Sequence, residues 1–150
     1  MKNIVFVCHG NICRSTMAEF LFRDMVKKAG REKDFAISSR ATSCEELGNP
    51  VHPGTRRVLE RLGISTKGKF AQRITAKECD EADLIIIMDE NNRRNLAPFI
   101  GSNGHKVASL LSYAGLSRDI SDPWYTGNFE ETYADVKLGL DALWELLNRK

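Results

Sequence analysis

The chain has 150 residues, 42% of them hydrophobic and 28% charged, and its 22 Lys and Arg against 20 Asp and Glu give a net charge of +2. This length and composition predict one globular domain over residues 1–150 and exclude a disordered chain. Because the net charge is small and evenly spread along the sequence, it excludes a positively charged surface of the kind that binds nucleic acid. The apolar run in "MKNIVFVCHG" is too short for a signal peptide or a membrane span, so we predict a cytoplasmic protein with no membrane partner.

The predicted elements alternate between short apolar strands and helices. The first strand covers 3–8, and the helix after it begins at a capping box of Thr16 and Glu19 and ends near Gly30. The later elements are a strand over 35–41, a helix over 53–63, a strand over 82–89, a short helix over 90–96, a weaker strand over 106–111 and a helix over 128–148.

This alternation predicts an α/β fold, a doubly wound parallel sheet with helices on both faces. Ligands of such sheets bind outside the carboxyl ends of the strands. Cys8 stands at the end of the first strand, in the stretch "VCHGNICRST". We therefore expect the functional site to begin at Cys8.

The loop between Cys8 and Arg14 has the residues of an anion cradle. A loop that leads into a helix N-terminus turns backbone N–H groups toward a bound anion, and Gly10 and Asn11 tolerate the unusual backbone angles that this requires. The same positive field favours the thiolate form of a cysteine, so Cys8 is predicted to be a nucleophile. Arg14 would grip two oxygens of a tetrahedral oxyanion, and Ser15 would donate a hydrogen bond to the sulfur. These residues predict covalent phosphoryl transfer through a cysteinyl phosphate.

The other cysteines and the histidines do not predict a metal site. Cys8 and Cys13 have four residues between them, no second paired motif follows, and the three histidines are scattered along the chain. A chain without a leader is expected to keep its four cysteines as thiols rather than disulfides. Cys44 and Cys79 have no chemical partners in the sequence, and we treat them as ordinary residues.

Three motifs resemble the low-molecular-weight protein tyrosine phosphatases, in the same order and over almost the whole chain: "VCHGNICRS" at 7–15, "MDENN" at 88–92 and "DPW" at 122–124. The resemblance implies a four-stranded parallel sheet, a phosphotyrosine protein or peptide as substrate, inorganic phosphate as product, and no metal or organic cofactor. We expect a monomer, with a weak dimer as the alternative.

The resemblance also assigns roles to residues. Asp122 matches the general acid, which then acts as the base for the attacking water. Ser39 matches a serine that holds the loop asparagine, here Asn11, in a strained conformation, and Asp89 would orient polar groups near the site or cap a helix. Oxidation in the family can pair the nucleophile with a second cysteine, here Cys13. The substrate-binding residues implied are His9, Gly10, Asn11, Ile12, Cys13, Ser15, Trp124 and Tyr125.

Three rival functions share parts of this pattern. Protein arginine phosphatases resemble the sequence closely but typically carry threonine where Ile12 stands. Thioredoxin-coupled arsenate reductases need further relay cysteines, which Cys44 and Cys79 do not form. A non-catalytic phosphate-binding module would be expected to have lost Cys8 or Asp122.

The sequence departs from the resemblance at one wall of the expected cleft. Many members of the family carry an aromatic residue where Glu45 stands, facing the position of Trp124. Glu46 follows directly. We therefore expect an acidic rim here, and the sequence leaves open whether His9 contacts the substrate or points to solvent.

Overall fold

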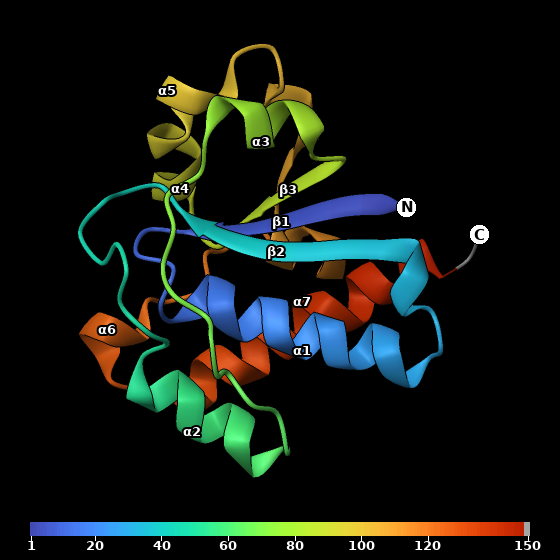
Figure 1. Ribbon diagram of the computed structural model, residues 1–150, viewed down its shortest axis with the longest axis vertical. Coiled ribbons are helices and arrows are strands. Elements are labelled where there is room, and N and C mark those ends of the chain that lie inside the picture. The colour runs from blue at the N-terminus through green and yellow to red at the C-terminus, as the bar shows by residue number, and fades with distance from the viewer. Residues whose placement is uncertain (149–150) are drawn as a thin grey trace.

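A four-stranded parallel sheet forms the centre of the computed structural model, which describes residues 1–148 (Figure 1). The strand order is β2-β1-β3-β4, and each neighbouring pair is parallel. The strands are β1 (Lys2–Cys8), β2 (Phe35–Ala41), β3 (Leu84–Ile87) and β4 (Val107–Ser109). The predicted sheet is confirmed, with the strand that carries Cys8 in its interior.

Helices cover both faces of this sheet, as the alternation of elements predicts (Figure 1). The helices of one face are α1 (Arg14–Lys28), α2 (Pro53–Arg61) and α7 (Phe129–Leu147), and those of the other are α3 (Ala76–Glu81), α4 (Glu90–Asn95) and α5 (Ala97–Ile100). The short helix α6 (Pro123–Thr126) precedes α7. The 3-10 turns among residues 1–148 are η1 (Glu32–Asp34), η2 (Gly104–Lys106) and η3 (Leu110–Ala114).

The apolar run of β1 serves both layers because its side chains alternate between the two faces of the sheet. Ile4 and Phe6 belong to the core under α1 and α7. Val5 and Val7 belong to the second core, which packs against α3 and α5. A strand buried on both sides in this way reads as a continuous apolar run in the sequence. The two cores hold the carboxyl end of β1 in place.

The fourth strand is shorter than predicted. A strand was expected over 106–111, but β4 ends at Ser109 and the chain turns into η3. Leu110 leaves the sheet because it packs against Gly139 of α7, where a Cβ atom would lie 2.5 Å from Leu110 Cγ. Burial under α7 therefore ends the strand at a position where the apolar pattern alone continues it.

The predicted capping box at the start of α1 is wrong. The helix begins three residues earlier, with Arg14 as its first residue, and its N-cap residue Cys13 makes no side-chain capping bond. Thr16 instead donates its hydroxyl to the carbonyl of Cys13 at 3.1 Å, and Glu19 is buried at 2% exposure and points toward β2. The first N–H groups of α1 therefore lack a side-chain cap and are free to bind an anion.

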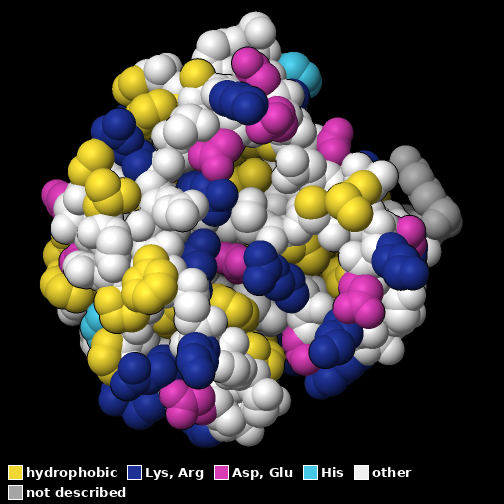
Figure 2. Space-filling model, in the orientation of Figure 1, with side chains coloured by type: hydrophobic (Ala, Val, Ile, Leu, Met, Phe, Trp, Pro, Cys, Tyr) yellow, Lys and Arg dark blue, Asp and Glu magenta, His cyan; other side chains and the backbone are white. Residues whose placement is uncertain are grey.

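Charges of opposite sign lie beside one another on the face that Figure 2 shows, over α1 and α2. These two helices contain the ion pairs of Lys28 with Asp24 and of Arg56 with Glu60. Between residues 1 and 148, none of the helices combines the length and apolar character that a membrane crossing demands. The cytoplasmic location stays a prediction.

Candidate active site

The candidate site lies where β1 and β3 end side by side. Cys8 is the last residue of β1, and Asp89 follows β3, its parallel neighbour. The chain continues from β1 to β2 on one side of the sheet and later returns to β3 on the other, so this edge is a switch point of the topology. Such switch points form the ligand crevice of open α/β sheets.

The sulfur of Cys8 receives polar contacts from its own loop. Ser15 Oγ lies 3.0 Å from Cys8 Sγ, and the backbone N–H of Asn11 donates to Cys8 Sγ at 3.3 Å. Contacts of this kind stabilise negative charge on sulfur, and the N-terminus of α1 adds a favourable dipole. The thiol is 3% exposed and free. Ser15 and Cys8 are therefore in contact, and the donation of a hydrogen bond from Ser15 to the sulfur stays a prediction.

Asn11 holds the loop in an unusual backbone conformation. Its φ of 60° is the only positive value among the non-glycine residues that the structure describes. The side-chain amide donates to Ser15 Oγ at 2.9 Å and to Ser39 Oγ at 2.8 Å, and its oxygen accepts from the N–H of Gln72 at 3.2 Å. The predicted contact between Asn11 and Ser39 is therefore present. Three bonds from one buried side chain can maintain a conformation that alone would be strained.

Behind Asn11, the polar network continues into the interior. Ser39 donates its hydroxyl to Glu19, whose other carboxylate oxygen lies 2.7 Å from Arg23 Nη2. Lys69 Nζ lies 3.0 Å from Glu19 Oε1. Burial lowers the pKa of Lys69 below its ordinary value, and the charge of Glu19 opposes this shift. The buried carboxylate is thus balanced by two cations, as a charge in this environment requires.

Arg14 is fixed under the cleft by three acceptors. Its Nη1 donates to Asp89 Oδ2 at 2.7 Å and to the carbonyl of Ile120 at 2.9 Å, and its Nη2 donates to Asp122 Oδ2 at 3.4 Å. Burial lowers the pKa of Arg14, but the charges of Cys8, Asp122 and Asp89 outweigh burial and raise it above its ordinary value. The side chain is 2% exposed, and Nε has no partner. This orphan donor fits an anion that arrives in the cleft.

Asp122 and Asp89 each accept hydrogen bonds from Arg14 and from a backbone N–H group at the start of a helix. Asp122 Oδ2 contacts Arg14, while Oδ1 accepts from the N–H of Trp124 at 3.0 Å as the N-cap of α6. Asp89 is the N-cap of α4 and also the partner of Arg14, so both roles weighed for it are present. Asp119, the other acidic residue of this segment, accepts from the N–H of Glu90 instead. Of the two aspartates, it is Asp122 that lines the cleft.

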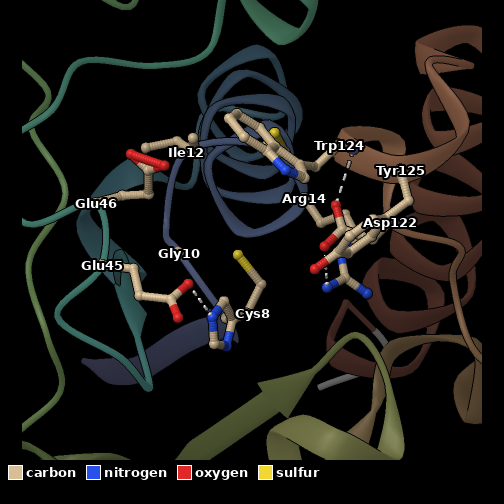
Figure 3. A pocket seen from close by; sticks show the side chains of 11 residues that line it. Cys8, Gly10, Ile12, Arg14, Glu45, Glu46, Asp122, Trp124 and Tyr125 are labelled. Atoms are coloured by element: carbon tan, nitrogen blue, oxygen red, sulfur yellow. Dashed lines mark hydrogen bonds and ion pairs between the residues drawn. The ribbon is translucent and has the colours of Figure 1, made fainter.

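The cleft above Cys8 has two different walls, which Figure 3 shows facing one another. One wall is aromatic and comes from α6, with Trp124 56% and Tyr125 83% exposed. The other comes from the loop after β2 and carries Glu45 and Glu46. His9 also lines the cleft and contacts Glu45, with 2.6 Å between His9 Nε2 and Glu45 Oε2. The lining residues are Cys8, His9, Gly10, Ile12, Cys13, Arg14, Glu45, Glu46, Asp122, Trp124 and Tyr125.

The remaining cysteines differ in their surroundings. Cys13 lines the cleft, and burial, followed by the charge of Cys8, raises the pKa of its thiol. Cys44 is exposed and accepts a bond from Arg73 Nη1 at 3.0 Å, and Cys79 is buried in the second core. The four thiols are free, and reversible pairing of Cys8 with Cys13 stays a prediction. Among residues 1–148, no group of three or more His, Cys, Asp or Glu could hold a metal ion.

The sequence reasoning missed His52, which supports the aromatic wall. Its ring stacks on Phe129 with centroids 4.9 Å apart and meets the Trp124 ring edge-on at 5.7 Å. As the N-cap of α2, it accepts from the N–H of Gly54 at 3.0 Å. Its place directly before Pro53 was a sign of this capping role, since proline favours the first helical position. The ring contacts depend on α7 and had no sign in the sequence.

A family model described as "Low molecular weight phosphotyrosine protein phosphatase" matches residues 3–150. The chain belongs to this family. Its members are hydrolases, so the predicted enzyme class is confirmed. The resemblance drawn from the three sequence motifs is confirmed with it.

Individual relatives cover nearly the whole chain. A low molecular weight protein-tyrosine-phosphatase of Bacillus subtilis (strain 168), YfkJ, is 41% identical over 146 residues, 95% of this chain and 94% of its own length. The phosphatase PtpA of Staphylococcus aureus (strain MRSA252) is 35% identical over 144 residues, 95% of this chain and 92% of its own. The crystal structure of YfkJ superposes with a TM-score of 0.94 at 39% identity and covers 99% of this chain and 96% of that one.

Proposed function

We propose that this enzyme hydrolyses phosphotyrosine in proteins or peptides through a cysteinyl-phosphate intermediate. The observation that carries the proposal is the convergence of the Cys8 sulfur, the orphan Nε of Arg14 and the Asp122 carboxyl group on one cleft. The B. subtilis and S. aureus relatives named as protein-tyrosine-phosphatases support the same substrate class. Inorganic phosphate is the second product.

In the first step, the Cys8 thiolate attacks phosphorus and the bond from phosphorus to the tyrosine oxygen breaks. Asp122, protonated for this step, gives its proton to the departing oxygen, so that tyrosine leaves as the neutral phenol. Arg14 and the loop N–H groups hold the equatorial oxygens, on which charge accumulates. Ser15 lies 3.0 Å from the sulfur and is placed to stabilise it when it becomes the leaving group.

In the second step, the Asp122 carboxylate takes a proton from a water molecule as that water attacks phosphorus. The bond from sulfur to phosphorus breaks, phosphate leaves and the Cys8 thiolate is restored. Each proton that Asp122 gives in the first step is thus recovered in the second.

Among the lining residues, Ile12 favours phosphotyrosine over phosphoarginine. It is an apolar side chain on the cleft, 7% exposed, at the position where the arginine phosphatases typically carry a threonine hydroxyl. The aromatic wall of Trp124 and Tyr125 is suited to stack on a phosphorylated aryl ring. Phosphoarginine and arsenate remain the substrates against which the proposal is tested.

The test measures phosphate release from a phosphotyrosine peptide in the presence of a metal chelator, with phosphoarginine and arsenate as parallel substrates. Cys8→Ser is expected to abolish hydrolysis, and Asp122→Asn to slow it about 10²- to 10⁴-fold. Matched controls are Cys44→Ser and Asp119→Asn, which change the same residue types outside the cleft. Turnover of phosphoarginine or arsenate alone would overturn the proposed substrate. Full activity of Cys8→Ser would overturn the mechanism.

A further inference from the structure

The wall of the cleft that faces Trp124 and Tyr125 carries two carboxylates. Glu45 and Glu46 both line the cleft, on the loop that follows β2 (Figure 3). A separate observation indicates that the cleft binds an anion: Arg14, one of the residues that line it, is 2% exposed, and its Nε has no hydrogen-bond partner. Acidic residues on the rim of an anion site affect which charges the substrate can carry next to its phosphate group.

Contacts hold both glutamates on this wall. The carboxylate of Glu45 lies 2.6 Å from His9 Nε2, and its side chain remains 70% exposed. Glu46 accepts from Asn49 Nδ2 at 2.6 Å. Its methylene groups lie against the phosphate-binding loop, because a Cβ atom at Gly10 would come within 3.2 Å of Glu46 Cγ. One carboxylate is therefore open to a ligand, and the other stands directly beside the loop.

The nearby cations that the structure describes are already engaged. Arg14 is buried and contacts Asp89 and Asp122. Arg73, behind the same loop, donates to Cys44 Sγ and lies over the ring of Phe99, 5.4 Å from its centroid. A phosphate dianion in the cleft is therefore repelled by the glutamates, and a positive group on the substrate beside the phosphate would offset this repulsion.

We propose that Glu45 and Glu46 select phosphotyrosine residues that have Lys or Arg next to them in the substrate. The inference rests on the proposed phosphotyrosine activity and names the substrate class more narrowly. The positive side chain extends from the phosphotyrosine along the acidic wall and meets Glu45, while the phosphotyrosine ring faces Trp124. Because Glu45 is exposed, its contribution is modest and sensitive to salt.

The test uses three phosphotyrosine peptides of equal length that differ only in the residues flanking the tyrosine: Lys, Ala or Glu. For the unmodified enzyme we expect kcat/KM to be about tenfold higher on the Lys peptide than on the Glu peptide. The double variant Glu45→Gln and Glu46→Gln should reduce this ratio to about twofold, mainly by improving the Glu peptide. Raising NaCl from about 50 to about 500 mM should reduce the ratio of the unmodified enzyme in the same direction.

The double variant Glu32→Gln and Glu81→Gln is the matched control, because both residues are exposed, in η1 and at the end of α3, and the net charge changes equally. It should leave the ratio unchanged. Hydrolysis of the Ala peptide with a ratio near one would overturn the inference and leave the proposed function standing. A high ratio that survives the double variant Glu45→Gln and Glu46→Gln, or that the control variant also reduces, would overturn it as well. Failure on all three peptides would instead overturn the phosphotyrosine activity itself.

Discussion

The phosphate-binding loop over residues 8–15 and the two walls of the cleft differ in how they are held. In the loop, Cys8, Asn11 and Arg14 are 3%, 1% and 2% exposed, and each has several polar contacts. On the walls, Trp124 and Tyr125 are 56% and 83% exposed. The chemistry depends on donors fixed within fractions of an ångström, whereas recognition tolerates side chains that move. Changes in the loop should therefore affect turnover and stability, and changes on the walls should affect substrate binding.

Among the changes that compare the loop with the walls, Arg14→Lys should have the largest effect. A lysine ammonium cannot reproduce the planar fork that contacts Asp89 and Ile120 while leaving Nε for the phosphate. We expect kcat/KM on a phosphotyrosine peptide to fall about 10²- to 10³-fold, as for the loss of an oxyanion donor. Steady-state kinetics measure this, with Arg31→Lys, remote from the cleft, as the control. A loss below about tenfold would show that the charge alone suffices at this position.

Asn11→Ala should affect stability and turnover together. Alanine loses the contacts to Ser15, Ser39 and Gln72 and is strained at a φ of 60°. We expect the free energy of unfolding to fall by about 2–3 kcal/mol, measured by urea denaturation, and kcat to fall about tenfold or more. Asn11→Gly accepts the backbone angle and should recover about 1 kcal/mol of this loss without restoring kcat. Equal urea midpoints for all three proteins would contradict the role of the network.

Trp124→Ala should affect only binding. The indole is 56% exposed, so its removal should leave the urea midpoint unchanged. The loss of stacking on the substrate ring should raise KM for the phosphotyrosine peptide about 3- to 10-fold, with kcat within about twofold of the parent. A fall in kcat as large as that of Asn11→Ala would remove the distinction between loop and wall.

His52 supports the aromatic wall and should give the smallest effect, a dependence of stability on pH. Burial, followed by the charge of Arg57, holds the pKa of His52 below its ordinary value of 6.5. As the pH falls through 6.5, the unfolded chain binds a proton here before the folded protein does, so stability that is present above 6.5 is lost. Because His52 is only partly buried, the loss is a few tenths of a kcal/mol, on the order of an exposed interaction.

The variant His52→Asn isolates this contribution, because asparagine also caps helices and does not titrate. Urea denaturation of both proteins at about pH 7.5 and about pH 5.5 should show a smaller loss for the variant. All other residues are the same in both proteins, so their contributions cancel in the difference. Identical losses would assign no pH dependence to His52.

The sequence alone was a good guide to the strands and to the loop. Apolar runs and the spacing of Cys8 and Arg14 are local features, and the parallel sheet and the strand, loop and helix order were predicted from them. The errors occurred where a distant contact overrides local preference. Leu110 leaves the predicted strand to pack under α7, and Glu19 leaves the predicted capping box for Ser39.

The cysteine, the arginine and the aspartate of the proposed chemistry can be predicted from short sequence motifs, because the backbone conformation around each depends on its immediate neighbours. The contacts between these residues cannot be predicted in this way. Three arrangements join segments far apart in the chain: Arg14 with Asp122 at 3.4 Å, the ring of His52 stacked on Phe129, and Glu45 on the wall opposite Trp124. Only the packing of β1, β3 and α7 around two cores brings these segments together. The distance between two such side chains depends on which residues are buried together in the folded protein, and the number of residues between them in the sequence does not predict it.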